Sequence, residues 1–292
     1  MKKVRSMLFM PGNNPGMLVS ADNLEADAII YDLEDAVALS EKDAARDLVY
    51  SALTSLTYEN SLVTVRINPK DSPYFYDDLE MVCKASPDGI VIPKASVKSI
   101  AEVDEFIREK SKKFGIKKDI RYFILVESAA GILNLEDIMK VSDKIDGILL
   151  GGEDYSVDME VERTTNSHEL QFARYKIATV AKAYKIAAID TPFTDINNVE
   201  GLKKDARFVK SIGFTGKLIV GPRQVHFINE IFSPSANEIE VAKAIINEAE
   251  NAKKKGLGVF SFKGKMVDSP VIARSENLIK AAEEWGLLWK IL

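Results

Sequence analysis

Two carboxylates in this sequence each follow a short apolar run, as side chains at the ends of buried strands do. Glu127 ends the run at 122–126, and Asp154 comes soon after the run at 148–150, with two glycines between. If both runs are neighbouring parallel strands, their carboxyl ends meet at one edge of the sheet and the two acids emerge together. Two hard oxygen ligands with room for water and substrate suit Mg²⁺. The alternative is that such acids only cap the next helices, but their recurrence along the chain favours a site.

Polar side chains recur wherever an apolar run ends. They are Glu34, Asp35, Arg66, Lys94, Glu127, Glu153, Asp154, Asp190 and Arg223. A metal ion on two of the acids could chelate an α-keto or α-hydroxy acid and polarise its carbonyl. Arg66 could neutralise a developing enolate oxygen. Together these groups suit cleavage of a carbon–carbon bond next to a carbonyl. A Schiff base on Lys94 is the alternative, but so acidic a ring keeps that lysine protonated.

Apolar runs and amphipathic helical stretches alternate along most of the chain. The predicted strands are 6–10, 28–35, 62–65, 89–92, 122–126, 148–150, 187–189 and 217–220. These runs are continuous rather than alternating, which is typical of parallel strands covered on both faces. Eight strand–helix units predict an α/β fold, a TIM (β/α)8 barrel, whose chemistry gathers at the carboxyl ends of its strands. A doubly wound sheet is the competing fold, but the chain has no G-x-G-x-x-G motif.

The chain continues beyond the eighth unit into a segment that a barrel does not need. Ser233-Pro234-Ser235 interrupts it, so we expect a catalytic barrel at 1–232 and a C-terminal extension and lid at 233–292. The expected elements of the extension are a helix at 236–255, an extended hairpin-like stretch at 258–268 and a last helix at 270–285. Such an apolar-faced tail packs on its own body or on another subunit.

Composition indicates the general class of protein. The chain of 292 residues has 39 Lys and Arg against 44 Asp and Glu, a net charge of −5 that gives no support to nucleic-acid binding. The single cysteine, Cys83, cannot form an intramolecular disulfide, and we interpret it as a core residue on a helix. The apolar stretch at 7–10 is too short for a signal peptide or a membrane span, so we expect a cytoplasmic protein.

Seven motifs in this order resemble those of a known family. They are 5–12 (RSMLFMPG), 32–37 (DLEDAV), 65–68 (VRIN), 126–128 (VES), 151–155 (GGEDY), 222–224 (PRQ) and 264–268 (GKMVD). Essentially the whole chain is similar to the citrate lyase β-subunit (citryl lyase) family, within the metal-dependent aldolase and malyl-CoA lyase superfamily of HpcH/HpaI type. The resemblance implies a TIM barrel, Mg²⁺ as cofactor, and cleavage of a citryl thioester into oxaloacetate and an acetyl thioester.

The resemblance also implies roles for acidic residues. The metal ligands of that family match Glu127 and Asp154, and Glu34 and Asp35 match residues that hold metal-bound waters. Asp268 matches an aspartate on a mobile lid, which reaches the active site of a neighbouring subunit and hands a proton to the thioester enolate. Its local sequence offers a plainer interpretation, because Ser269 and Pro270 look like the cap and first position of the last helix.

Substrate contacts follow from the same resemblance. Arg66 matches a substrate-binding arginine, and the backbone of Gly152 and Glu153 would cradle the keto-acid carboxylate. Arg5 lies in the motif expected to supply an arginine at the barrel mouth. The chain departs from the family at Gly152, where alanine is frequent, and at Gly221, where asparagine is frequent and could make a polar contact.

The carrier of the thioester is left open by the sequence. One alternative is a citrate lyase subunit that acts on a citryl-acyl carrier protein with α and γ subunits as partners. A free-standing malyl-CoA or citramalyl-CoA lyase is the second, and Lys42, Arg46 and Lys70 could bind the CoA phosphates. The third, a non-catalytic metabolite-binding or scaffold subunit, is disfavoured by the intact ring of acids and arginine. In either catalytic case we expect a homo-oligomer, a trimer or hexamer.

Overall fold

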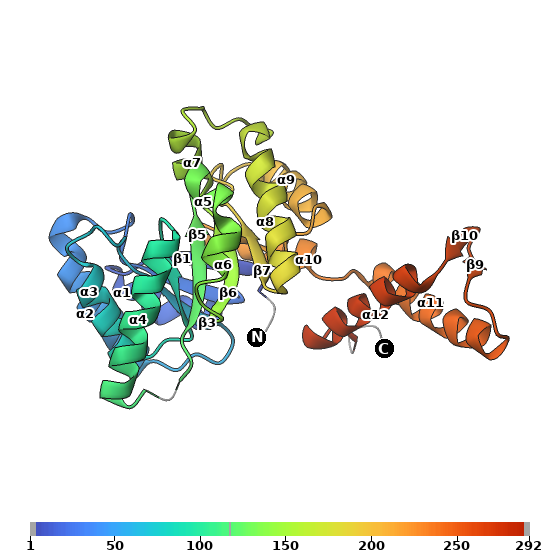
Figure 1. The fold of residues 1–292 in the computed structure, drawn as a ribbon, viewed down its shortest axis with the longest axis horizontal. Coiled ribbons are helices and arrows are strands. Elements are labelled where there is room, and N and C mark those ends of the chain that lie inside the picture. The colour runs from blue at the N-terminus through green and yellow to red at the C-terminus, as the bar shows by residue number, and fades with distance from the viewer. Residues whose placement is uncertain (1–3, 117, 289–292) are drawn as a thin grey trace. The chain divides into compact units, whose positions relative to one another are not determined.

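The computed structural model describes residues 4–116 and 118–288, and the chain divides into two compact units between Asn229 and Glu230 (Figure 1). The sequence placed this division between 232 and 233. No helix within the described ranges is both long enough and apolar enough to cross a membrane.

The first unit is a closed barrel of eight parallel strands. They are β1 (Ser6–Pro11), β2 (Ala28–Asp32), β3 (Leu62–Arg66), β4 (Gly89–Ile92), β5 (Arg121–Val126), β6 (Ile145–Leu150), β7 (Ala187–Asp190) and β8 (Gly216–Ile219). Pairing of β1 with β8, with Leu8 beside Ile219, closes the ring. The TIM barrel prediction is confirmed. β2 ends at Asp32 rather than at 35, because the Asp32 carboxylate accepts hydrogen bonds from the amides of Glu34 and Ala36 and turns the chain.

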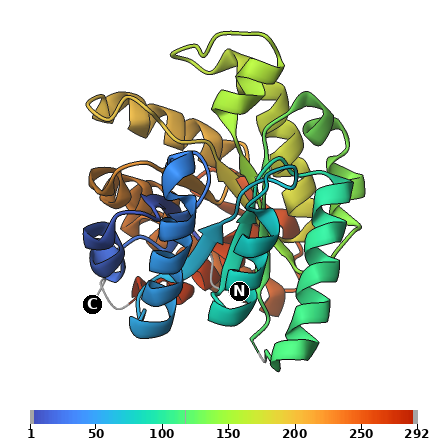
Figure 2. The same ribbon diagram turned by 90° about the vertical axis from the view of Figure 1, so that its left-hand side faces the viewer.

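Helices follow the strands and surround them (Figure 2). They are α1 (Pro15–Ser20), α2 (Lys42–Ser55), α3 (Phe75–Ala85), α4 (Val97–Phe114), α5 (Ala129–Leu133), α6 (Leu135–Met139), α7 (Gly152–Asp158), α8 (Gln171–Tyr184), α9 (Val199–Ser211) and α10 (Val225–Phe232). Short 3-10 turns lie at Ala21–Leu24, Leu39–Glu41, His168–Leu170 and Pro222–Gln224. Cys83 on α3 is fully buried, and burial raises the pKa of its thiol to about 11, as suits a core residue.

Apolar side chains fill the sheet and leave chemistry to its ends. The main cluster of buried side chains is Val4, Met7, Ala28, Ile30, Val91, Phe123, Leu125, Leu149, Ile189 and Leu218. These residues come from seven of the eight strands and from the segment before β1. Burial of this apolar surface is the main source of stability for the barrel.

The second unit pairs two helices with a small hairpin. Its elements are α11 (Ala236–Lys254), β9 (Phe260–Phe262), β10 (Lys265–Val267) and α12 (Ser269–Glu284). β9 and β10 are antiparallel, and Lys263 and Gly264 form their turn with φ of 47° and 75°. Asp268 itself caps α12, since its side chain accepts from the Val271 amide at 3.4 Å. The sequence assigned the cap to Ser269, one residue too late.

Candidate active site

Charged side chains gather where β2, β3, β5 and β6 end. This set consists of Asp32, Glu34, Asp35, Arg66, Glu127 and Asp154, and the structure brings all six to the carboxyl end of the barrel. Parallel strands have their carboxyl ends on one side, so residues far apart in sequence meet there. We call this set the acidic mouth.

Arg66 is fixed by a buried carboxylate. Its Nε donates to Asp32 Oδ1 at 2.7 Å and its Nη2 to Oδ2 at 2.5 Å, while the guanidinium lies 4.8 Å from the centre of the Phe9 ring. Burial by itself would lower the pKa of Arg66, but the hydrogen bonds and charge of Asp32 and its acidic neighbours raise it. The guanidinium therefore stays charged and holds one orientation.

Sequence reasoning gave Asp32 no role of its own. Asp32 is 1% exposed and lies beside Arg66 in the parallel register of β2 and β3. A charged residue inside an otherwise apolar run was the available signal. It was missed because the strand was expected to continue to 35.

Two buried glutamates share the mouth with Arg66. The Oε2 atom of Glu34 lies 3.0 Å from Arg66 Nη1 in an ion pair but accepts no hydrogen bond. Burial raises the pKa of Glu34 to about 8, the Arg66 charge opposes this rise, and nearby carboxylates add to it. Burial likewise raises the pKa of Glu127 to about 7, against a hydrogen bond from the Lys94 amide and with a contribution from Asp154. The cluster thus has an excess of negative charge that a cation would neutralise.

Glycine allows β5 and β6 to bring their acids together. A Cβ on Gly151 would lie 2.6 Å from the Cβ of Glu127 and 2.8 Å from its Oε2, so only glycine fits there. Directly beyond, Asp154 lies exposed in the first turn of α7. The close approach of Glu127 to the segment that carries Asp154 therefore depends on the absence of a side chain at Gly151.

The donor set of the mouth fits Mg²⁺. Within the described ranges, no three His, Cys, Asp or Glu side chains are placed so as to hold a metal ion by themselves. Mg²⁺ commonly binds one or two carboxylates and keeps several waters. Glu127 and Asp154 would be its ligands, and Glu34 with its unsatisfied oxygen and Asp35 would hold its waters. These assignments stay predictions.

The prediction for Arg5 is wrong, because the structure places it at the other end of the barrel. Arg5 precedes β1, and its Nε and Nη2 each donate at 2.8 Å to Asp27, which precedes β2. The amino ends of the strands lie opposite the acidic mouth. Arg5 therefore joins β1 to β2 and cannot contact a substrate held by Glu127.

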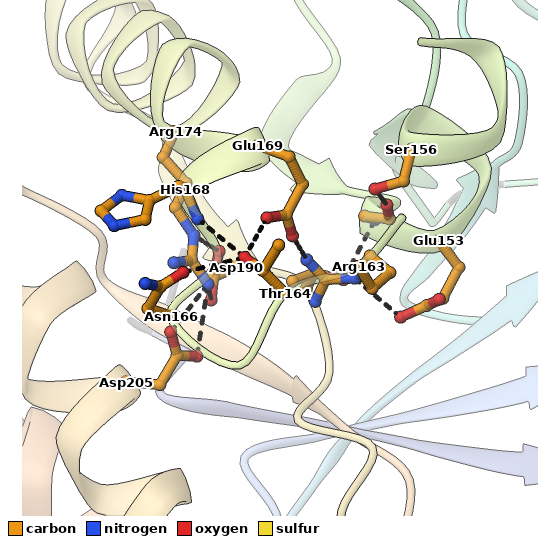
Figure 3. A network of polar contacts seen from close by, with 12 residues as sticks. Glu153, Ser156, Arg163, Thr164, Asn166, His168, Glu169, Arg174, Asp190 and Asp205 are labelled. Carbon is orange, nitrogen blue, oxygen red and sulfur yellow. Dashed lines mark hydrogen bonds and ion pairs between the residues drawn. The ribbon is translucent and has the colours of Figure 1, made fainter. Parts of the chain in front are cut away.

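The predicted donor role of the Gly152 amide conflicts with the structure. This amide donates to the Thr191 hydroxyl at 3.0 Å, and a Cβ on Gly152 would lie 2.7 Å from that oxygen. The Glu153 amide follows in the first turn of α7, where helix amides lack partners within the helix. It is the better candidate for a carboxylate. The Glu153 side chain instead accepts from Arg163 at 2.9 Å (Figure 3).

Asp190 is removed from the mouth by a buried charge network (Figure 3). Arg174 and Lys217 bind its two oxygens at 2.9 and 2.5 Å, and all three side chains are 0% exposed. Asp205 shares both cations, and although burial would raise its pKa, their charges lower it. The network joins β7 and β8 to α8 and α9, so its role is structural, and it fixes the strand end from which Thr191 extends.

The remaining cations near the mouth mostly have partners within the chain. Lys42 is buried and donates to the carbonyls of Leu33 and Glu34 at 2.7 and 2.6 Å. Arg46 pairs with Asp78 at 2.7 Å, and Lys70 pairs with Glu102 at 2.9 Å. The proposed phosphate patch is therefore not supported by these three residues. Arg223 is exposed and lines a cavity of about 460 Å³ near the start of α9.

The fold and the acidic mouth define an aldolase-type barrel with carboxylates and a fixed arginine at its strand ends. The chain belongs to the HpcH/HpaI aldolase/citrate lyase family, whose sequence profile matches residues 5–222. It is 41% identical over 280 residues to the citrate lyase subunit beta of Leuconostoc mesenteroides subsp. cremoris, covering 95% of this chain and 93% of that protein. The family resemblance seen in the motifs is confirmed.

Two further relatives widen the comparison. The chain is 30% identical over 300 residues to the L-malyl-CoA/beta-methylmalyl-CoA lyase of Cereibacter sphaeroides, covering 96% of this chain and 94% of that protein. Among solved structures, CitE from Mycobacterium tuberculosis in complex with magnesium, acetoacetate and coenzyme A matches with a TM-score of 0.80 at 26% identity. That match covers 96% of this chain and 98% of CitE.

Replacing Arg66 by lysine is expected to lower turnover more than it weakens keto-acid binding. Lysine keeps the charge but loses the planar fork that Asp32 holds at two points. A misplaced ammonium would still attract the ground-state carboxylate but would no longer face the developing enolate. Steady-state kinetics give kcat, and calorimetry with the keto acid gives its affinity. Wild-type kinetics would reduce Arg66 to a structural ion-pair partner.

The protein without metal is expected to lose stability as pH rises from about 5 to 8. The native pKa values of Glu34 and Glu127 are about 8 and about 7, above the ordinary 4.5. The native state therefore binds more protons than the unfolded state in this window, and the free energy of unfolding falls as pH rises. Thermal unfolding in EDTA measures the effect. A Glu34→Gln, Glu127→Gln double variant should show a flatter profile, and an equal fall in both proteins would contradict the buried-acid explanation.

Proposed function

We propose that this chain is a magnesium-dependent carbon–carbon lyase that cleaves a citryl thioester into oxaloacetate and an acetyl thioester, as the β subunit of a citrate lyase. The observation that carries the proposal is the acidic mouth itself, in which Arg66 lies against buried carboxylates whose pKa values are raised. Similarity to the citrate lyase beta subunits over nearly the whole chain supports this substrate class.

Cleavage must break one carbon–carbon bond and move two protons. The bond between the thioester α-carbon and the hydroxyl-bearing carbon breaks, and its electrons pass to the thioester as an enolate. The hydroxyl gives its proton to a base and becomes the ketone of oxaloacetate, while the enolate takes a proton from an acid and becomes the acetyl group. Bound Mg²⁺ supplies a Lewis acid for the oxygens of the keto acid.

The residues of the chain orient and stabilise this charge. Asp32 occupies Nε and Nη2 of Arg66, so Nη1 is the nitrogen left to face the mouth, where it contacts Glu34 at 3.0 Å and Asp35 at 3.4 Å. A substrate oxygen would take the place of one of these contacts. The Glu153 amide at the start of α7 would bind the keto-acid carboxylate. We assign the final proton to Asp268 of a neighbouring subunit.

We favour an acyl carrier protein as the thioester carrier, with α and γ subunits as partners and with several copies of this chain in the complex. Binding of CoA would require cations for its phosphates. Lys42, Arg46 and Lys70 instead bind carbonyl or carboxylate oxygens of this chain, so these three residues do not form a phosphate site. A free-standing malyl-CoA or citramalyl-CoA lyase is the second candidate, supported by the similarity to the lyase of Cereibacter sphaeroides.

Substrate competition tests the proposal. Purified protein is offered citryl-acyl carrier protein, citryl-CoA and malyl-CoA with Mg²⁺, and the released keto acid is identified. Oxaloacetate formed fastest from the carrier protein is the expected result, and EDTA should suppress it. Glyoxylate from malyl-CoA as the main product would favour the second candidate. Release from none of the three would point to a non-catalytic subunit and overturn both.

A further inference from the structure

Lys94 has a backbone conformation that lysine rarely adopts. It follows β4, between Pro93 and Ala95, and has φ of 48°, in the left-handed region. A Cβ makes this region unfavourable, so glycine and asparagine are the residues usually found there. Such strain persists only where the surroundings enforce it, and it concentrates at functional sites.

Most other side-chain-bearing residues with positive φ have simple explanations. Glu25, Ser86 and Lys185 end helical segments, and Lys263 lies in the β9–β10 turn. Left-handed residues are ordinary at such positions. Lys94 instead lies two residues after the end of a barrel strand, where the chain would normally continue toward the next helix.

The Lys94 amide points into the acidic mouth rather than along the sheet ladder. Pairing of β4 with β5 ends at Ile92 beside Ile124, and the Ala95 amide bonds the Leu125 carbonyl at 3.1 Å. Between these two points the Lys94 N–H leaves the sheet ladder and donates to Glu127 Oε1 at 2.6 Å. The Lys94 side chain is exposed to solvent.

The other side of the Glu127 carboxyl group is also confined. Its Oε2 packs against the backbone of Gly151, so close that no Cβ fits between them. One oxygen is therefore bound by an amide and the other is held against Gly151, just beyond the end of β6. This arrangement fixes the plane of the Glu127 carboxylate before any cation arrives.

We propose that Lys94 is a positioning residue that orients Glu127 for the metal ion through its backbone N–H, and that the left-handed conformation, rather than the ammonium group, is what the site requires. This inference rests on the proposed function, in which Glu127 is a metal ligand. It predicts that Mg²⁺ affinity follows the tolerance of residue 94 for positive φ and not its charge.

Three variants separate conformation from charge. Lys94→Gly and Lys94→Asn tolerate the left-handed region without an ammonium group, whereas the β-branched Lys94→Val resists it. We expect the first two to bind Mg²⁺ within about threefold of wild type, and Lys94→Val to bind ~10–100-fold more weakly, the usual range for loss of a group that orients a metal ligand. Calorimetry without substrate measures these affinities.

Two results would overturn the inference. Equal weakening in all three variants would assign the role to the ammonium, and unchanged affinity in Lys94→Val would remove any positioning role. Because Lys94→Val could fail to fold, a second measurement uses the ¹⁵N–¹H signal of residue 94. Glu127→Gln should shift this signal in the metal-free protein, and an unmoved signal would contradict the hydrogen bond.

Failure of this inference can be told apart from failure of the proposed function. If wild type binds Mg²⁺ and releases oxaloacetate while the three variants do not separate as expected, only the role of Lys94 is lost. If wild type neither binds Mg²⁺ nor releases a keto acid, the proposed function fails first.

Discussion

Glu127→Gln and Asp154→Asn should each abolish release of oxaloacetate and weaken Mg²⁺ binding by more than about 100-fold, beyond the usual loss for a residue that only supports a ligand. Each change keeps the shape of the side chain but removes the negative charge that a hard cation requires. Activity assays and calorimetry with Mg²⁺ measure the two effects separately.

The fold should survive both substitutions. In the absence of metal, burial raises the pKa of Glu127 to about 7, and the charge of Asp154 adds to this rise. A neutral amide at position 127 removes this unfavourable buried charge. Circular dichroism and thermal unfolding in EDTA should show variants as stable as wild type or more so. Glu136→Gln on α6 is the matched control, because it removes the same charge from an exposed side chain. Unchanged Mg²⁺ affinity in both site variants would mean that the metal site lies elsewhere.

The fold could be predicted from sequence because a barrel has a strong local signal. Strands buried on both faces read as unbroken apolar runs, and all eight observed strands overlap the predicted ranges. The acids that follow β5 and β6 were predictable for the same reason, since parallel strands bring their carboxyl ends together. What the runs do not encode is the direction of each side chain at a strand end.

Asp190 and Asp32 illustrate that limit. Both end apolar strands, and both are buried carboxylates, yet one lies among Arg174 and Lys217 and the other holds Arg66 in the mouth. An alternating strand would show which face a residue takes, but a run that is apolar on both faces does not. The basic partners come from distant elements, so their choice of carboxylate depends on tertiary packing.

Arg5 and Gly152 show a different limit. Arg5 stands just before its strand, and the position alone assigns it to the amino end of the barrel, but the motif around it suggested the mouth. The Gly152 amide is bonded by a hydroxyl 39 residues away. A motif records which residues occur together, whereas the partner of a backbone amide is decided by packing between β7 and α7.

Asp268→Asn is expected to leave folding and Mg²⁺ binding unchanged but to reduce turnover severely. Asp268 caps α12 through the Val271 amide, and asparagine and serine are caps of equal quality, so Asp268→Asn and Asp268→Ser keep the helix start. Neither can donate a carboxylic-acid proton to an enolate. Asp268→Ala is the control for the cap, since it loses both functions and should unfold at a lower temperature. Full turnover in Asp268→Asn would leave Asp268 with its structural role alone.

Mixing of subunits should recover activity if Asp268 acts in a neighbouring active site. An Asp268→Asn protomer keeps an intact acidic mouth but supplies no proton, whereas an Arg66→Ala protomer keeps Asp268 but lacks the guanidinium that Asp32 holds in the mouth. Each variant alone should be inactive. In a mixed oligomer, some intact mouths would receive Asp268 from an Arg66→Ala neighbour and complete the reaction. The measurement is oxaloacetate release after co-refolding or co-expression, with subunit exchange followed by differently tagged chains. Exchange without any recovered activity would mean that Asp268 does not act in trans, because every mixed oligomer would then hold only incomplete sites.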